Sequence, residues 1–207
     1  MPVRAQKDSL GIMADQEYLI ALGGNLPSRS GEPALTLRAA LEDLRAAGVR
    51  IVAVSCFYHT PCFPAGAGPD YVNAAARLGS DLDPAAFLAL LHGIEAAHGR
   101  ARDVPQAGRW GMRTLDLDLL AAGDLVLPDA ATQAEWRDLP PDQQARATPD
   151  RLILPHPRMQ DRAFVLVPLA DVAPDWVHPL TGRSVARMCA DLPAAERAAV
   201  VAMESRL

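Results

Sequence analysis

The chain has 207 residues, of which 50% are hydrophobic and 22% are charged, and its formal net charge is −5. These values are typical of a globular protein with a single domain and a real core. The acidic balance argues against a nucleic-acid partner, and no apolar run reaches the roughly 18 residues of a membrane span. The three cysteines lack the paired spacing of a zinc site or a disulfide framework, so we expect a cytoplasmic protein.

The first elements are defined by turn signals on either side of apolar runs. Residues 1–16 are polar and mixed, so we expect a disordered leader followed by one domain over residues 17–207. Residues 17–22 predict a buried strand that ends in a turn cluster beginning at Gly23. This cluster is not a Walker loop, because no Gly-Lys-Ser/Thr follows. Residues 33–47 show the leucine spacing of an amphipathic helix.

The middle of the chain continues with two strands and a second helix. Residues 49–58 and 71–78 are rich in β-formers and predict strands. A helix is expected from the N-cap Asp83 to the stop at Gly99. Glu95 stands near the end of this helix, where its charge opposes the helix dipole. That position suggests a functional role, although an exposed surface glutamate explains it equally well.

The most informative stretch is residues 114–120, which alternate polar and apolar side chains as a half-buried strand does. Asp116 and Asp118 would share one face, where two carboxylates can converge on one cation. Oxygen donors without His or Cys suit Mg²⁺ better than Zn²⁺. Arg109, Trp110 and Arg113 lie close by, as a flat anionic substrate would require. The alternative is a strand face that is simply solvated.

The C-terminal half carries a break in the pattern and one conspicuous histidine. Residues 128–150 are rich in Pro, Ala, Asp and Gln, and we expect an inserted loop with one short helix. His156 stands between two prolines, which fix the backbone and favour a functional role. The other expected elements are strands at residues 125–127 and 152–154, a helix at 164–173 and a terminal helix within 179–207.

The order strand, helix, two strands, helix and strand pair predicts the fold class. It corresponds to an α+β, ferredoxin-like βαββαβ sandwich, with helices on one face of a mostly antiparallel sheet. Extra strands and C-terminal helices complete the expected domain.

Several motifs, in this order, resemble one known family. They are Gly-Gly-Asn-Leu from Gly23, Phe-Tyr-His-Thr-Pro from Phe57, Asp-Tyr-Val-Asn-Ala-Ala from Asp70, Arg-Trp-Gly-Met-Arg-Thr-Leu-Asp-Leu-Asp from Arg109, and Pro-His-Pro-Arg-Met from Pro155. Together they are similar to the 6-hydroxymethyl-7,8-dihydropterin pyrophosphokinases of folate synthesis, over about residues 17–180.

The resemblance implies transfer of a pyrophosphoryl group from ATP to 6-hydroxymethyl-7,8-dihydropterin, giving AMP and the pterin diphosphate. By resemblance, Asp116 and Asp118 hold two Mg²⁺ ions and act with the catalytic Arg100 and Arg113. The implied ATP contacts are Glu95, Arg102, Arg109, His156 and Arg162, and the implied pterin contacts are Thr60, Pro61, Tyr71, Asn73, Trp110 and Phe164. A monomer with these two small-molecule substrates is expected.

The sequence departs from the family pattern at a few positions, and two other functions are compatible with it. Gly24 replaces a frequent serine, Asp103 and Pro105 alter the basic loop, and residues 128–150 exceed the usual hairpin connection. Our hypothesis is that this insertion contacts the ATP side, because it precedes Arg151 and His156. The rivals are a palm-type nucleotidyltransferase, which would release pyrophosphate, and a non-catalytic ferredoxin-like binding module.

Overall fold

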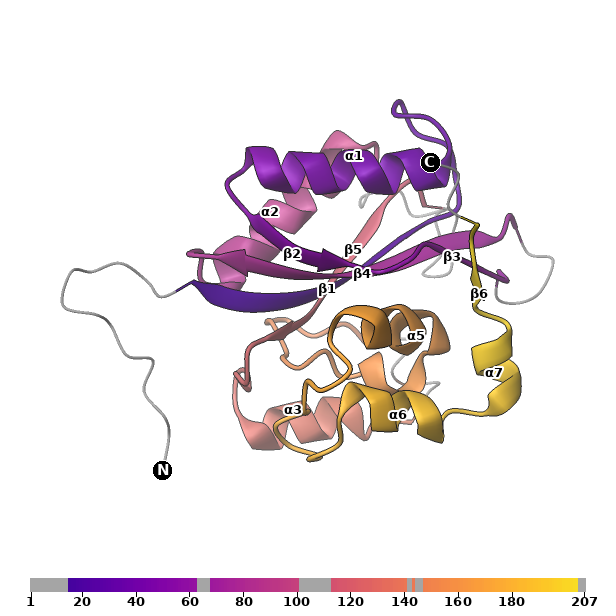
Figure 1. Ribbon diagram of the computed structural model, residues 1–207. Coiled ribbons are helices and arrows are strands. Elements are labelled where there is room, and N and C mark those ends of the chain that lie inside the picture. Colours follow the sequence, from indigo (N-terminus) through magenta and orange to yellow (C-terminus); the bar gives the residue numbers. More distant parts are fainter. Residues whose placement is uncertain (1–14, 63–67, 101–112, 141–142, 144–146, 205–207) are drawn as a thin grey trace.

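The structure, a computed structural model, describes residues 15–62, 68–100, 113–140, 143 and 147–204 (Figure 1). The elements of the N-terminal part, in chain order, are β1 (Gln16–Gly24), α1 (Pro33–Ala46), β2 (Arg50–Val54), β3 (Tyr58–Thr60), β4 (Tyr71–Ser80), α2 (Pro84–Ala97) and β5 (Asp116–Ala122). Those of the C-terminal part are α3 (Ala130–Arg137), the 3₁₀ turn η1 (Met159–Asp161), α5 (Ala163–Val172), α6 (Val185–Asp191), α7 (Ala194–Ala198) and β6 (Val201–Ala202).

An antiparallel sheet forms the centre of the molecule. Its strand order is β5-β1-β4-β3-β6, and β2 also pairs with β4. The succession β1-α1-β2-β4-α2-β5 is the βαββαβ pattern, so the predicted ferredoxin-like α+β class is confirmed. The expectation of helices on one face alone was wrong, because α5 and α6 cover the face opposite α1 and α2 (Figure 1). None of the helices in the described part of the chain is long and apolar enough to cross a membrane.

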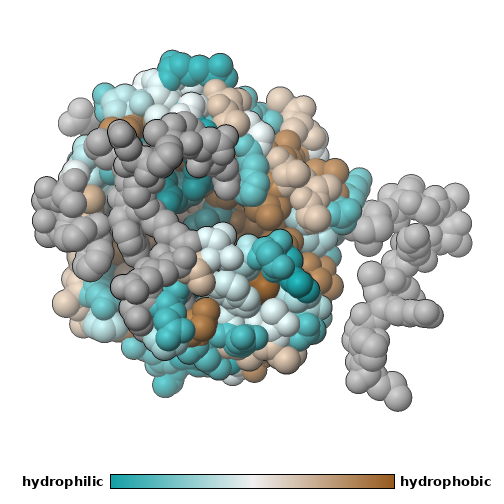
Figure 2. Space-filling view, turned by 180° about the vertical axis from the view of Figure 1, so that it is seen from behind, coloured by the Kyte–Doolittle hydropathy of each residue, from teal (hydrophilic) through white to brown (hydrophobic). Residues whose placement is uncertain are grey.

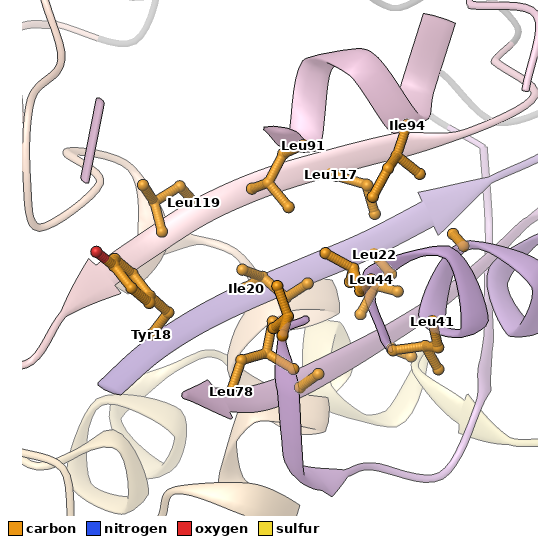
Figure 3. Packing of buried hydrophobic residues seen from close by; sticks show 14 of the residues in the cluster. Tyr18, Ile20, Leu22, Leu41, Leu44, Leu78, Leu91, Ile94, Leu117 and Leu119 are labelled. Carbon is orange, nitrogen blue, oxygen red and sulfur yellow. The ribbon is translucent and has the colours of Figure 1, made fainter. Parts of the chain in front are cut away.

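Each face of the sheet has its own core, as the two-residue period of a strand requires. Tyr18, Ile20 and Leu22 point toward α1 and α2, where Leu44, Leu91 and other buried side chains meet them (Figure 3). Leu19 and Ala21 point to the other face and pack with α5 and α6. Leu115, Leu117 and Leu119 are buried in the first core, so Asp116 and Asp118 belong to the second face, as the alternation predicts.

The predicted strand over residues 49–58 is two strands, β2 and β3. Between them the Ser55 hydroxyl, instead of a backbone carbonyl, accepts the Ala75 N–H at 2.9 Å. Cys56 then donates its N–H to the Asp171 carboxylate on α5 at 3.2 Å. These side-chain acceptors replace ladder bonds, so the strand is interrupted although its residues are β-formers.

The short strands predicted next to the insertion do not join the sheet. Leu127 and Leu154 form an isolated antiparallel bridge with each other, directly before Pro128 and Pro155. The expected short helix in the insertion is confirmed as α3. The predicted terminal helix is instead α6, α7 and β6, because Pro193 follows the end of α6 and the chain then turns back to pair with β3.

Two predictions at the N-terminus also change. Gln16, assigned to the leader, is the first residue of β1, while residues 1–14 lie outside the described residues. Gly23 and Gly24, assigned to a turn, are the last residues of β1 and pair with β4. Neither has a positive φ, so these glycines are required by close approach and not by turn geometry.

Candidate active site

One row of residues crosses the sheet and forms the floor of the candidate site. Gly23 on β1 lies opposite Asn73 on β4 and opposite Asp116 on β5. A Cβ at Gly23 would come within 2.8 Å of the Asn73 Oδ1 atom, so a side chain there would displace the amide. The next row places Ala21 beside Asp118. Small residues in the central strand therefore leave room between an amide on one strand and two carboxylates on another.

A cavity of about 690 Å³ opens over this floor, which is within the range of small-molecule sites. Figure 2 shows the molecule from behind, where hydrophilic surface occupies a hollow beside hydrophobic surface. The predicted site residues that line the cavity are Thr60, Pro61, Tyr71, Asn73, Arg100, Arg113, Asp116, Asp118, His156, Arg162 and Phe164. The tertiary structure thus brings together residues that are far apart in sequence.

Charged groups converge on Asp116, whose side chain is 19% exposed. Arg100 and Arg113 each donate to one of its carboxylate oxygens. Arg100 also pairs with Glu95, which is fully buried and accepts the Leu117 N–H at 2.8 Å. The alternative of an exposed Glu95 is therefore wrong. It lies behind Arg100 and holds that guanidinium, because a buried carboxylate needs a paired cation.

The second carboxylate faces the start of α5. Arg162 approaches Asp118 at 3.9 Å, and its guanidinium carbon lies 5.6 Å from the centre of the Phe164 ring. Asp116 and Asp118 supply only oxygen donors, which fit Mg²⁺. No group of three or more His, Cys, Asp or Glu side chains suited to a metal occurs among the described residues. A bound ion would therefore need oxygens from water or from an anionic substrate.

An aromatic and amide subsite lies beside these charges. Asn73 is 5% exposed and donates from Nδ2 to the Thr60 hydroxyl at 2.6 Å, which fixes the amide plane. Tyr71 pairs with Thr60 across the β3–β4 ladder. Burial raises the pKa of the Tyr71 hydroxyl, while nearby Arg113 acts to lower it. Tyr71 therefore stays protonated next to the cationic group, as a neutral flat surface for a ring.

His156 is held by its backbone and by one ring nitrogen. Its N–H donates to Leu120 at 2.8 Å, and its Nδ1 accepts the Arg158 N–H at 3.1 Å. Burial, together with the charges of Arg162 and Arg158, lowers the pKa of His156 to about 3. The ring is therefore neutral near pH 7, and because Nδ1 accepts, its proton is on Nε2. His156 can donate one hydrogen bond without adding charge.

The sequence-based interpretation missed Asn25, which follows the Gly-Gly pair. Asn25 is 3% exposed, and its Oδ1 accepts the Arg113 N–H at 2.8 Å. Its own N–H donates to the Arg113 carbonyl at 2.9 Å, and its Nδ2 donates to the Pro69 carbonyl at 3.1 Å. Asn25 thus fixes the Arg113 backbone and the segment before Tyr71. A polar residue directly after a buried strand was the available signal.

Three predicted site residues, Arg102, Arg109 and Trp110, lie outside the described residues. The three cysteines, Cys56, Cys62 and Cys189, are free thiols.

The comparisons with known proteins agree with this geometry. The chain is 40% identical over 179 residues to a Pseudomonas aeruginosa protein named 2-amino-4-hydroxy-6-hydroxymethyldihydropteridine pyrophosphokinase, covering 86% of this chain and 93% of that protein. A Synechocystis protein of the same name is 36% identical over 171 residues, covering 82% and 73%.

Solved structures show the same fold at low identity. Wild-type HPPK-DHPS of Plasmodium falciparum superposes with a TM-score of 0.56 at 13% identity, over 85% of this chain and 44% of that chain. The present chain therefore corresponds to less than half of that protein. The family model described as 7,8-dihydro-6-hydroxymethylpterin-pyrophosphokinase (HPPK) matches residues 19–174. The family match covers most of the chain, and the cavity brings the paired aspartates, the arginines, Asn73 and Tyr71 together. The chain therefore belongs to the HPPK family.

Proposed function

We propose that this chain transfers the pyrophosphoryl group of ATP to the hydroxymethyl group of 6-hydroxymethyl-7,8-dihydropterin, as the family assignment implies for tetrahydrofolate synthesis. The observation that carries the proposal is the row Asn73–Gly23–Asp116. It places an amide for a pterin edge on β4 and a carboxylate for a metal on β5, on either side of β1 in one cavity floor. The reaction needs this juxtaposition, because the pterin hydroxyl must reach the phosphates.

Asp116 and Asp118 would hold Mg²⁺, with two ions proposed, and phosphate oxygens would complete the coordination. Bound Mg²⁺ would neutralise phosphate charge and make the attacking hydroxyl more acidic. Arg100 and Arg113, now paired with Asp116, would turn toward the phosphates when ATP and metal bind. Guanidinium groups are suited to this exchange because they bind carboxylate and phosphate with the same fork geometry.

The remaining roles follow from shape and charge. Tyr71 and Phe164 offer flat faces for the pterin ring, and Asn73 offers donor and acceptor atoms for its amide edge. Arg162 sits between Asp118 and Phe164, where it can contact a phosphate. The neutral His156 can donate to the nucleotide.

Arg102, Arg109 and Trp110 are proposed as further contacts from the family resemblance alone. We also propose a cytoplasmic monomer, in which the three free thiols stay reduced.

Product analysis tests the proposal directly. The protein is mixed with ATP, Mg²⁺ and 6-hydroxymethyl-7,8-dihydropterin, and the nucleotides are separated by chromatography. We expect AMP to form only when the pterin is present, with an equal amount of pterin diphosphate. Pterin-dependent ADP would contradict pyrophosphoryl transfer, and folded protein with no pterin-dependent turnover would contradict the activity itself.

A further inference from the structure

The insertion between β5 and the His156 turn contains a helix that the proposed chemistry does not use. The helix α3 begins at the N-cap Asp129, whose carboxylate accepts the Thr132 N–H at 2.9 Å. It lies on the same side of the sheet as α5 and α6 (Figure 1). One of its residues, Gln133, is fully buried, although glutamine is mostly exposed in proteins. A buried amide indicates a specific partner.

That partner is the peptide group in front of His156. The Nε2 of Gln133 donates to the Pro155 carbonyl at 3.0 Å, and the Oε1 of Gln133 accepts from Arg137 at 3.4 Å. The N–H of the same Pro155–His156 peptide donates to Leu120 on β5 at 2.8 Å. The peptide is thus bonded to α3 at its carbonyl and to the central sheet at its N–H. The insertion helix is therefore tied to the strand that carries Asp116 and Asp118.

Trp136 lies three residues after Gln133, on the same side of the helix, and lines the cavity. Thr148 and Arg151, which follow the helix in the chain, line it too. Leu88 and His92 of α2 contribute lining from the other face of the sheet. The insertion thus lines one wall of the cavity and α2 lines another. Because β5 is an edge strand, these two walls meet around its free edge.

The parts of the cavity differ in chemistry. Arg100, Arg113 and the paired aspartates occupy the phosphate part, and Asn73 with Tyr71 occupies the pterin part. The remaining lining is apolar or neutral in large part and includes Leu119, Leu152, Ile153 and Trp136. A flat, uncharged ring attached to a phosphate chain matches this remaining part. The nucleoside of ATP has that character.

We propose that Trp136, held in place by Gln133, forms the wall that packs against the nucleoside of ATP. Residues of the insertion would then set nucleotide affinity without affecting the pterin pocket. This inference rests on the proposed function for the identity of the nucleotide. It does not rest on the transfer step, because AMP alone can occupy a nucleoside subsite.

The test is AMP binding by isothermal titration calorimetry, without pterin. We expect Trp136→Ala to weaken AMP binding about tenfold, as loss of a stacked or packed aromatic contact does, and Trp136→Phe to retain most of it. Glu135→Ala is the matched control, because Glu135 is the neighbouring exposed residue on the same helix and does not line the cavity. The KM for the pterin should stay within twofold in all three variants.

Two further measurements separate a contact from a structural effect. AMP should quench tryptophan fluorescence in the native protein, and the quench should shrink in Trp136→Phe while calorimetric binding persists. Gln133→Leu should raise the KM for ATP several-fold and leave the KM for pterin unchanged. This split distinguishes positioning from general destabilisation, which would affect both substrates.

The possible outcomes are distinct. Unchanged AMP affinity in Trp136→Ala, or an undiminished quench in Trp136→Phe, would overturn the inference even if the enzyme turns over normally. Should Trp136→Ala not fold, the quench difference decides alone. Conversely, Trp136-dependent AMP binding in a protein that makes no pterin-dependent AMP would sustain the nucleoside wall and overturn the proposed function.

Discussion

The cavity has two sides that are built in different ways. On the strand side, Asp116, Gly23 and Asn73 are placed by the register of three adjacent strands, and the pairing of β1 with both neighbours is regular from Ile20 to Gly23. On the turn side, the His156 N–H donates to the Leu120 carbonyl and its Nδ1 accepts the Arg158 N–H. The insertion adds one bond, from Gln133 to the Pro155 carbonyl. Many hydrogen bonds together fix a residue in a sheet, whereas only a few fix a residue in this turn.

Mutations on the two sides should therefore have different consequences. Substitutions on the strand side should remove chemistry and leave the fold intact, because the ladder does not depend on those side chains. Substitutions on the turn side should shift affinity or stability through small displacements. The contrast can be tested by substitutions on each side, beginning with those that should abolish turnover.

The largest effect is expected at the paired carboxylates. Asp116→Asn keeps the shape but loses the charge that would hold the metal and that now pairs with Arg100 and Arg113. We expect turnover to fall by about a thousandfold or more, with a higher Mg²⁺ requirement. Steady-state kinetics at several Mg²⁺ concentrations measure both. Asp124→Asn, at an exposed position just beyond β5, should be silent, and comparable loss there would mean a non-specific effect.

The next effect is expected at Arg113. Arg113→Ala removes the guanidinium that is needed most when phosphate charge develops, so turnover should fall about a hundredfold. The Kd for pterin, measured by calorimetry, should change little. The exposed Arg187 on α6 supplies the control substitution Arg187→Ala. Lost pterin affinity with full turnover would show that the assigned role is wrong.

Asn25 tests a residue directly after β1 that is held, like the turn side, by a few hydrogen bonds, because it bonds Arg113 and Pro69. Asn25→Ala leaves buried backbone groups without partners, so we expect the free energy of unfolding to fall by about 1–3 kcal/mol. Turnover should fall about tenfold beyond any change in folded fraction, because the Arg113 backbone is no longer held. Asn25→Asp keeps the acceptor for the Arg113 N–H and should recover part of the turnover. Equal turnover in the two variants would exclude this positioning role.

The last prediction concerns the pH dependence of stability on the turn side, where no loss of turnover at neutral pH is involved. The pKa of His156 is lowered to about 3 in the folded chain, so below about pH 6.5 the unfolded chain binds a proton that the folded chain does not. Stability should therefore fall as pH decreases from about 6.5 toward 3, by at most about 1.4 kcal/mol per pH unit from this group. His178 adds the same trend, since burial lowers its pKa to about 4.

Urea unfolding at pH 4.5 and 7 measures this loss. His156→Gln should reduce the difference in unfolding free energy between the two pH values, and the slope due to His178 should persist. An unchanged difference in the variant would mean that His156 does not resist protonation in the folded protein.

Much of the fold was predictable because it is encoded locally. The alternation from Leu115 to Leu119 identified which face of β5 is buried, and Asp83 with Gly99 delimited α2 to within a residue or two. The predictions that were wrong concern elements that depend on residues distant in the sequence. The break between β2 and β3 requires Asp171 on α5, and the bridge of Leu127 with Leu154 replaces two expected strands.

The candidate site divides in the same way. The acidic pair, the basic residues around it and the family could be inferred from the sequence, because these reside in short motifs with specific spacing. Three contacts could be learned from the folded chain alone: Glu95 lies buried behind Arg100, Asn25 holds Arg113, and Gln133 bonds the peptide before His156. These contacts join residues far apart in the chain, and a hydrogen bond depends on position in space, which local pattern does not specify.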